Sequence, residues 1–151
     1  QNVSNGNTVT VRIVAASSAS VARTGTVTIG GVSDTMTIYT TDTIPDQFDF
    51  GNAVNLTAAN GANANELSSI VTLSGMTAGI STTATYSGTS YGGFSVNGGT
   101  YSNTSKTVVN GNTLRINIYG QLPENGSQTG TVTVNGISDS FVVNVAASGS
   151  T

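Results

Sequence analysis

The chain contains no cysteine, no histidine and no tryptophan, and only two prolines among its 151 residues. Without cysteine, disulfide bonds and thiolate metal ligands are excluded. Without histidine, the commonest general base and the imidazole ligand of metal centres are missing as well. The usual nucleophiles and bases are therefore scarce, and the sequence predicts that the chain is not an enzyme.

Charged residues are also few, at 7% of the chain. Four basic residues stand against seven acidic ones, which gives a net charge of −3. So few basic side chains cannot neutralise a phosphate backbone, and we expect no nucleic-acid partner. No apolar run approaches the roughly 18 residues that a membrane-spanning helix needs, so we expect no membrane insertion.

The residues that are abundant are those of strands and turns. The chain is rich in threonine, serine, asparagine and valine and has 19 glycines. β-branched residues suit a pleated sheet, and glycine and asparagine suit tight turns. A low-complexity polar linker would have a similar composition. The regular alternation of apolar and polar residues, for example at 8–14, favours β-strands over that alternative.

An internal repeat organises the chain. Residues 3–41 align without a gap on residues 108–146, each position being shifted by 105 residues. The identities cluster: Asn-Gly-Asn-Thr recurs at 5–8 and 110–113, and Thr-Gly-Thr-Val-Thr recurs at 24–28 and 129–133. A repeat of about 100 residues has the length of one β-sandwich domain. The chain therefore holds the second half of one repeat followed by one whole repeat.

This repeat predicts an all-β chain in four segments. Residues 1–41 are the C-terminal half of a repeat, with its last three strands, and residues 42–46 are a linker. Pro45 lacks a backbone donor and has a fixed φ, which suits a semi-rigid joint. Residues 47–146 form the complete repeat, and residues 147–151 are a flexible tail or the next linker.

In the half repeat we expect antiparallel strands at 8–14, 24–29 and 32–40, with a tight turn at Gly30-Gly31. The alternation predicts a core-facing side for them, made by Val9, Val11, Ile13, Val27 and Ile29. Three strands cannot bury such a face alone. We therefore expect the missing strands to come either from a longer array or from a neighbouring subunit by strand complementation.

In the complete repeat we expect a sandwich of seven to nine strands. The pattern predicts strands at 47–50, 66–73, 80–86, 94–96, 113–119, 129–134 and 137–145, with a polar loop at 51–65. Phe48 and Phe50 share one face of the first strand. The predicted core consists of Val71, Leu73, Ile116, Val132, Val134 and Phe141.

Several stretches resemble a known family. PDQFDF, VTLSGM, GGFSVNGGTYS, VVNGNTLRINI and TGTVTVNGISDSFVVNV are similar to the immunoglobulin-like tandem repeats of large bacterial secreted and cell-surface proteins. Similar modules are attached to bacteriophage virion proteins. The resemblance covers residues 3–146. The family's usual Asn-Gly-Asp turn is Asn-Gly-Asn in both copies here, so the acid of that turn is missing.

The resemblance implies an immunoglobulin-like antiparallel β-sandwich in tandem, located outside the cell on a bacterial surface or on a phage virion. It also implies a structural or adhesive role, as a spacer, a decoration module or part of a fibre. Its partners would be neighbouring immunoglobulin-like repeats or subunits. The alternative is a module that binds a glycan or a protein receptor through its loops.

Aromatic residues near the third and fourth strands bear on that alternative. Tyr86, Phe94 and Tyr101 are expected in the core, as aromatic residues at alternate strand positions usually are. Tyr91, placed between Ser90 and Gly92, is the expected exception and the candidate loop contact.

Two sets of acids are candidate ligands. Asp42, Asp46 and Asp49 bracket the linker, and a calcium ion takes about six to eight oxygen ligands. Their spacing matches no established calcium loop, so solvated linker acids are the alternative and we expect no cofactor. Asp34 and Asp139 occupy the same place in both repeats, and we expect them to cap a backbone turn rather than bind a ligand.

Overall fold

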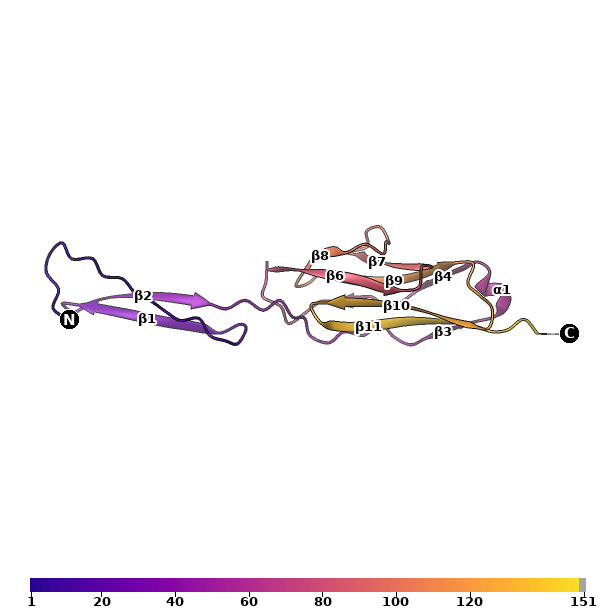
Figure 1. The fold of residues 1–151 in the computed structure, drawn as a ribbon, viewed down its shortest axis with the longest axis horizontal. Coiled ribbons are helices and arrows are strands. Elements are labelled where there is room, and N and C mark those ends of the chain that lie inside the picture. The colour runs from indigo at the N-terminus through magenta and orange to yellow at the C-terminus, as the bar shows by residue number, and fades with distance from the viewer. Residues whose placement is uncertain (150–151) are drawn as a thin grey trace. The chain divides into compact units, whose positions relative to one another are not determined.

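The structure is a computed structural model that describes residues 1–149, and it is nearly all β (Figure 1). The chain divides into unit 1 (Gln1–Asp42) and unit 2 (Thr43–Thr151). This boundary falls at the start of the segment 42–46, for which the sequence predicts a linker. Within residues 1–149 no helix is long and apolar enough to cross a membrane.

Unit 1 contains a β-hairpin. β1 (Ala22–Ile29) and β2 (Val32–Tyr39) pair antiparallel along their whole length. The turn between them is Gly30-Gly31, where φ is +57° and +86°. Two consecutive positive φ values define the type I′ turn, whose twist matches that of a hairpin and which glycine adopts without strain. The two predicted strands and their turn are confirmed.

Unit 2 is a sandwich of two sheets. Its elements are β3 (Val54–Leu56), α1 (Ala58–Gly61), β4 (Ala64–Leu67), β5 (Val71–Thr72), β6 (Ser81–Gly88), β7 (Gly92–Val96), β8 (Lys106–Val109), β9 (Thr113–Gly120), β10 (Gly126–Val134) and β11 (Ile137–Val145). One sheet has the order β3-β11-β10-β6-β8, and in the other β4 and β5 lie on one side of β9 and β7 on the opposite side. β3 runs parallel to β11, and the other pairs are antiparallel.

The core of unit 2 lies between these sheets. All six predicted core residues are buried, each with 7% exposure or less. Phe48 and Phe50 are buried as well, and their rings meet edge-on with centroids 5.6 Å apart. Alternate positions of β9, β10 and β11 point inward, which explains the period-two pattern in the sequence. In unit 1, by contrast, no residue is buried.

The strand predicted at 8–14 in unit 1 is wrong, because these residues belong to no strand. Their counterpart in unit 2 is β9, and every strand that pairs with β9 comes from residues 64–96. Unit 1 contains no counterpart of that region. A hairpin needs only a local turn, whereas this strand needs partners from elsewhere in the chain.

Near the start of unit 2, two further predictions are wrong. Residues 47–50 form no strand, although both phenylalanines are buried as expected. The predicted loop at 51–65 instead holds β3, the four-residue helix α1 and the start of β4. β3 forms because Val54 and Leu56 pack, half-buried, beside the end of β11. A three-residue strand is too short to give a visible alternation in sequence.

The strand predicted at 66–73 is divided into β4 and β5. The interruption is caused by Ser68, a buried polar residue. Its hydroxyl accepts a hydrogen bond from the N–H of Ile116 (2.9 Å), and the N–H of Ser68 donates to the Ile116 carbonyl (3.0 Å). The hydroxyl thus takes the place of a backbone acceptor, and the regular ladder is broken at this residue.

Candidate functional site

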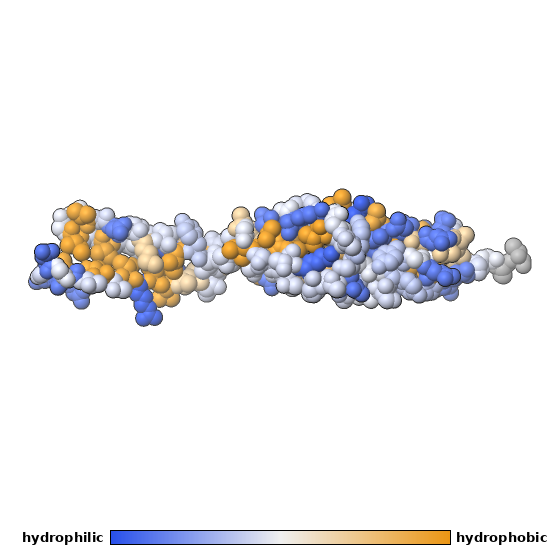
Figure 2. Space-filling model, turned by 90° about the horizontal axis from the view of Figure 1, so that it is seen from above, coloured by the Kyte–Doolittle hydropathy of each residue, from blue (hydrophilic) through white to orange (hydrophobic). Residues whose placement is uncertain are grey.

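Unit 1 carries an apolar groove of about 510 Å³. We call it the open face; it is lined by Val9, Val11, Val27, Ile29, Val32, Ser33, Asp34, Thr35 and Met36. The N-terminal part of the molecule accordingly shows a cluster of apolar atoms at its surface (Figure 2). Exposed apolar area of this kind is typical of surfaces that another molecule or segment covers.

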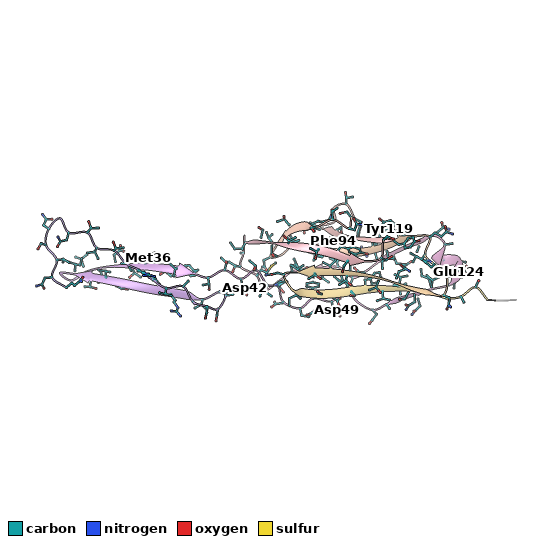
Figure 3. All side chains as sticks on the ribbon, in the orientation of Figure 1. Met36, Asp42, Asp49, Phe94, Tyr119 and Glu124 are labelled. Atoms are coloured by element: carbon teal, nitrogen blue, oxygen red, sulfur yellow. The ribbon has the colours of Figure 1, made fainter. Side chains whose placement is uncertain are left out.

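The internal repeat gives the residues of the open face buried counterparts in unit 2. Met36 is 48% exposed, whereas Phe141 at the corresponding position is 2% exposed. Ile29 is 43% exposed, and its counterpart Val134 is fully buried. Met36 is labelled on β2 in Figure 3. The same pattern therefore makes a core in unit 2 and a surface in unit 1.

The turn before the open face is formed in the same way in both units. In unit 1 the N–H of Ser4 donates to the Asn7 side chain (2.8 Å), and the N–H of Asn7 donates to the Ser4 carbonyl (3.1 Å). In unit 2 the same two bonds join Val109 and Asn112, at 2.9 and 3.1 Å. The Asn-Gly-Asn sequence sets this turn locally, without help from a partner sheet.

The two equivalent aspartates have different partners. The carboxylate of Asp139 accepts a 2.6 Å hydrogen bond from the N–H of Phe50. Asp34 accepts from the N–H of its neighbour Thr35 (2.8 Å). Capping of a nearby turn is therefore wrong for Asp139, which instead ties the segment that carries Phe48 and Phe50 to β11. The sequence pattern could not show this bond because its two residues are far apart in the chain.

Two neighbouring tyrosines of unit 2 are exposed. Tyr91 lies in the turn before β7 and is 38% exposed. Tyr119, labelled in Figure 3, lies near the end of β9 and is 42% exposed. The N–H of Tyr119 donates to the Tyr91 carbonyl (2.7 Å). Thr89 holds the turn, because its hydroxyl accepts from the Tyr91 N–H (3.1 Å). The sequence pointed to Tyr91 and missed Tyr119, which sits on a strand that otherwise reads as core.

Tyr86 and Phe94 lie inside, as expected of them. Phe94 is fully buried, and the half-buried Tyr86 ring stacks on it with centroids 6.5 Å apart. Burial, with a smaller contribution from the Tyr119 phenol, raises the pKa of Tyr86 from 10.0 to about 12. Its hydroxyl donates to the Thr89 carbonyl (3.2 Å). Tyr101 is half-buried.

Two of the acids near the predicted linker accept hydrogen bonds within unit 2. Asp46 accepts from the Ser74 hydroxyl (2.9 Å), and Asp49 accepts from the N–H of Gly51 (2.7 Å). Asp42 belongs to unit 1 (Figure 3). Across residues 1–149, no group of three or more acidic, histidine or cysteine side chains is placed to hold a metal ion. The expectation that Asp42, Asp46 and Asp49 are linker acids without a cofactor stays a prediction.

Comparison with protein-family models, with curated proteins and with solved structures finds no match for this chain. Function must therefore be inferred from the chain's own residues. The open face offers apolar contact area and one carboxylate, which suits packing against another layer of strands. The pair Tyr91 and Tyr119 offers two aromatic side chains, which suits contact with a sugar ring or a protein surface.

Proposed function

We propose that the chain is a non-enzymatic structural module made of immunoglobulin-like repeats, from an extracellular protein of a bacterial surface or from a phage virion. The observation that carries this proposal is the gapless repeat, one copy of which makes a β-sandwich on its own. Repeats of domain length in series are typical of proteins that extend from a surface as spacers, decorations or fibres.

The strand neighbours in unit 2 support the immunoglobulin-like assignment. β11, β10 and β6 are neighbours in one sheet, and β9 lies between β4 and β7 in the other. With β4 and β5 counted as one strand, and the edge strand β8 beside β6 left out of the count, β6, β10 and β11 are the third, sixth and seventh strands, and β4, β7 and β9 are the second, fourth and fifth. An immunoglobulin sandwich groups its strands into two sheets in the same way. The parallel pairing of β3 with β11 closes the edge next to the last strand.

The outer surface of the larger sheet fits a structural role. Hydroxyl pairs lie across β10 and β11, with 2.8 Å between Thr131 and Ser140 and 2.8 Å between Thr133 and Ser138. Such cross-strand pairs stabilise a sheet and present a hydrated, uncharged surface. A module that is repeated many times in an array gains from a surface that exposes no large apolar patch to its neighbours.

Surface labelling tests the proposal. Antibodies raised against residues 43–151 should label intact source cells or virus particles, and protease treatment of the intact cells or particles should remove that labelling. Antibodies against an intracellular protein, or against the packaged interior of the particle, serve as the control. Labelling that requires the cells or particles to be opened would contradict the proposed location.

A second function, glycan or receptor binding through loops, is favoured by the exposed pair Tyr91 and Tyr119. A glycan array probed with the full chain and with Tyr91→Ala and Tyr119→Ala tests it. Tyr39→Ala is the matched control, because Tyr39 is 76% exposed and lies in unit 1. Binding that both unit 2 variants lose and the control keeps would favour this function. No binding, or equal binding by all four proteins, would remove it.

A further inference from the structure

Unit 2 shows what covers the counterpart of the open face. We call residues 43–105 the front segment. It supplies strands to both sheets of unit 2, β3 and β6 to one and β4, β5 and β7 to the other, and its buried apolar residues are Phe48, Phe50, Ala64, Val71, Leu73, Met76, Ala84 and Phe94. The rest of the core comes mainly from β9 in one sheet and from β10 and β11 in the other, and their counterparts in unit 1, residues 8–14, β1 and β2, line the open face. The open face therefore carries the apolar residue pattern of a surface that packs against a front segment in unit 2.

The aspartates indicate where the first part of such a segment would bind. In unit 2 the bond from the Phe50 N–H to Asp139 ties the front segment to β11. Gln47 adds a second tie, because its side-chain amide donates to the Ser138 carbonyl (3.2 Å). Asp34 and Ser33 stand at the corresponding positions of unit 1, and both line the open face.

The first residues of unit 1 indicate from which side the segment would enter. By the repeat, residues 1–4 correspond to β8, which pairs with β6 and leads into β9 through the Asn-Gly-Asn turn. That turn is already formed in unit 1, with the same two hydrogen bonds. Residues 1–4 thus correspond to a whole strand that pairs with the front segment in unit 2, and Val3 is exposed where its counterpart Val108 is fully buried.

We propose that the open face binds the front half of an immunoglobulin-like repeat, a segment with the apolar pattern of residues 43–105 that is joined in series to Gln1 in the same polypeptide. Residues 1–4 point to this source, because their counterpart β8 follows the front segment directly in the chain and pairs with its strand β6. The proposal rests on the repeat and not on where the protein acts. Its failure would leave the proposed structural role of unit 2 intact.

An extended chain tests the proposal. A copy of the front segment is placed directly before Gln1 of the full chain, in the register that the repeat defines. Hydrogen exchange is then measured at the amides of Val9, Val11 and Ile13. We expect these amides to exchange at least about 100-fold more slowly than in the original chain, because opening would require unfolding of a completed sandwich. The amides of β9 report in both proteins that unit 2 is folded.

Val27→Asp is the matched variant. In the original chain it changes an open surface, and unit 2 and the exchange of residues 8–40 should not respond. In the extended chain it places a charge in the new core, and the protection should be lost. Unchanged fast exchange at Val9 to Ile13 in the extended chain, with rapid proteolysis of the added copy, would overturn the proposal.

A chimera tests whether the open face fits the front segment without lengthening the chain. Residues 3–41 replace residues 108–146, so that the open face meets the front segment that unit 2 already contains. We expect a cooperative unfolding transition with a denaturant slope close to that of unit 2. A chimera that stays unfolded under conditions where the original chain folds would contradict the fit.

Two further measurements test other occupants. Light scattering of the original chain should show a monomer, and a dimer with protected residues 8–40 would overturn the proposal in favour of a second copy. Free polypeptide 43–105, added to the original chain, should protect residues 8–40 far less than the fused copy does. Equal protection at micromolar concentration would overturn the placement in series.

Discussion

Units 1 and 2 share one sequence pattern and differ in burial. The hairpin of β1 and β2 turns at Gly30-Gly31 and that of β10 and β11 at Asn135-Gly136, each with two positive φ values, and the two hairpins have the same register. Only the second hairpin has a layer of strands packed against its apolar side. Local chemistry is therefore sufficient for a turn and a hairpin, whereas a core needs the front segment.

The largest expected difference between the units concerns one equivalent pair of core positions. Phe141→Ala should lower the free energy of unfolding of unit 2 by about 3–5 kcal/mol, because it opens a cavity between the sheets. Met36→Ala, its counterpart, should leave the unfolding of unit 2 unchanged, since Met36 lies on an open surface. Denaturant titration of both variants measures the difference. A loss below about 1 kcal/mol for Phe141→Ala would remove that residue from the core.

The equivalent aspartates should give the next largest difference. Asp139→Ala removes a charged acceptor from the Phe50 N–H and should lower the stability of unit 2 by about 1.5–3 kcal/mol. Asp34→Ala should have no effect on it. The same denaturant titration applies, with faster exchange of the Phe50 amide as a local readout. Equal effects of the two substitutions would mean that the bond to Phe50 contributes little.

The equivalent glycines Gly130 and Gly25 should differ in how much a substitution by alanine destabilises the protein. A Cβ at Gly130 would lie 2.7 Å from the Tyr86 hydroxyl and 2.9 Å from its ring, so Gly130→Ala should destabilise unit 2 by about 1–3 kcal/mol. At the counterpart Gly25 the nearest atoms belong to the half-exposed Ile13, 3.2 Å away. Those atoms can move, and Gly25→Ala should be tolerated. Thermal unfolding of each variant checks the pair, and a neutral Gly130→Ala would show that Tyr86 moves freely.

The smallest expected effect is a pH dependence that only unit 2 can show. Tyr86 lies in the front segment, and its pKa of about 12 in the folded state exceeds the value of 10.0 expected when it is unfolded. Its contribution to stability is therefore complete below pH 10 and is lost as the pH rises through about 12. The denaturation midpoint should fall more steeply over this range in the original chain than in Tyr86→Phe. Tyr39→Phe, in unit 1, should follow the original chain, and parallel curves for all three would contradict the burial of the Tyr86 phenol.

The sequence predicted the elements whose signal is local. The hairpins, the glycine turn and the core positions of β9, β10 and β11 follow from alternation and turn residues, and the structure confirms them. Residues 8–14 have the same alternation as β9 and form no strand. Alternation records which side of a segment would be buried, but pairing depends on strands that lie far away in the sequence.

The errors in unit 2 have the same origin. β3 is three residues long and is defined by its parallel pairing with β11, and the break between β4 and β5 is made by the hydroxyl of Ser68. Neither the short strand β3 nor the break at Ser68 produces a periodic pattern of apolar residues in the sequence. Among the candidate site residues, Tyr91 was found because it stands between turn residues. Tyr119 was missed because its neighbour Ile118 is buried and the strand reads as core to its end.

The parallel pairing of β3 with β11 determines how unit 2 would respond to tension. Parallel strands at the two ends of a domain are pulled in opposite directions along their length, so the hydrogen bonds between Val54–Leu56 and the end of β11 would be loaded in shear and would have to break together. The ties from Gln47 and Phe50 to Ser138 and Asp139 act on the same pair of segments. A hairpin such as β1 and β2 alone opens one bond at a time from its ends. Completion of the sandwich would therefore turn a weak link into a part that resists extension.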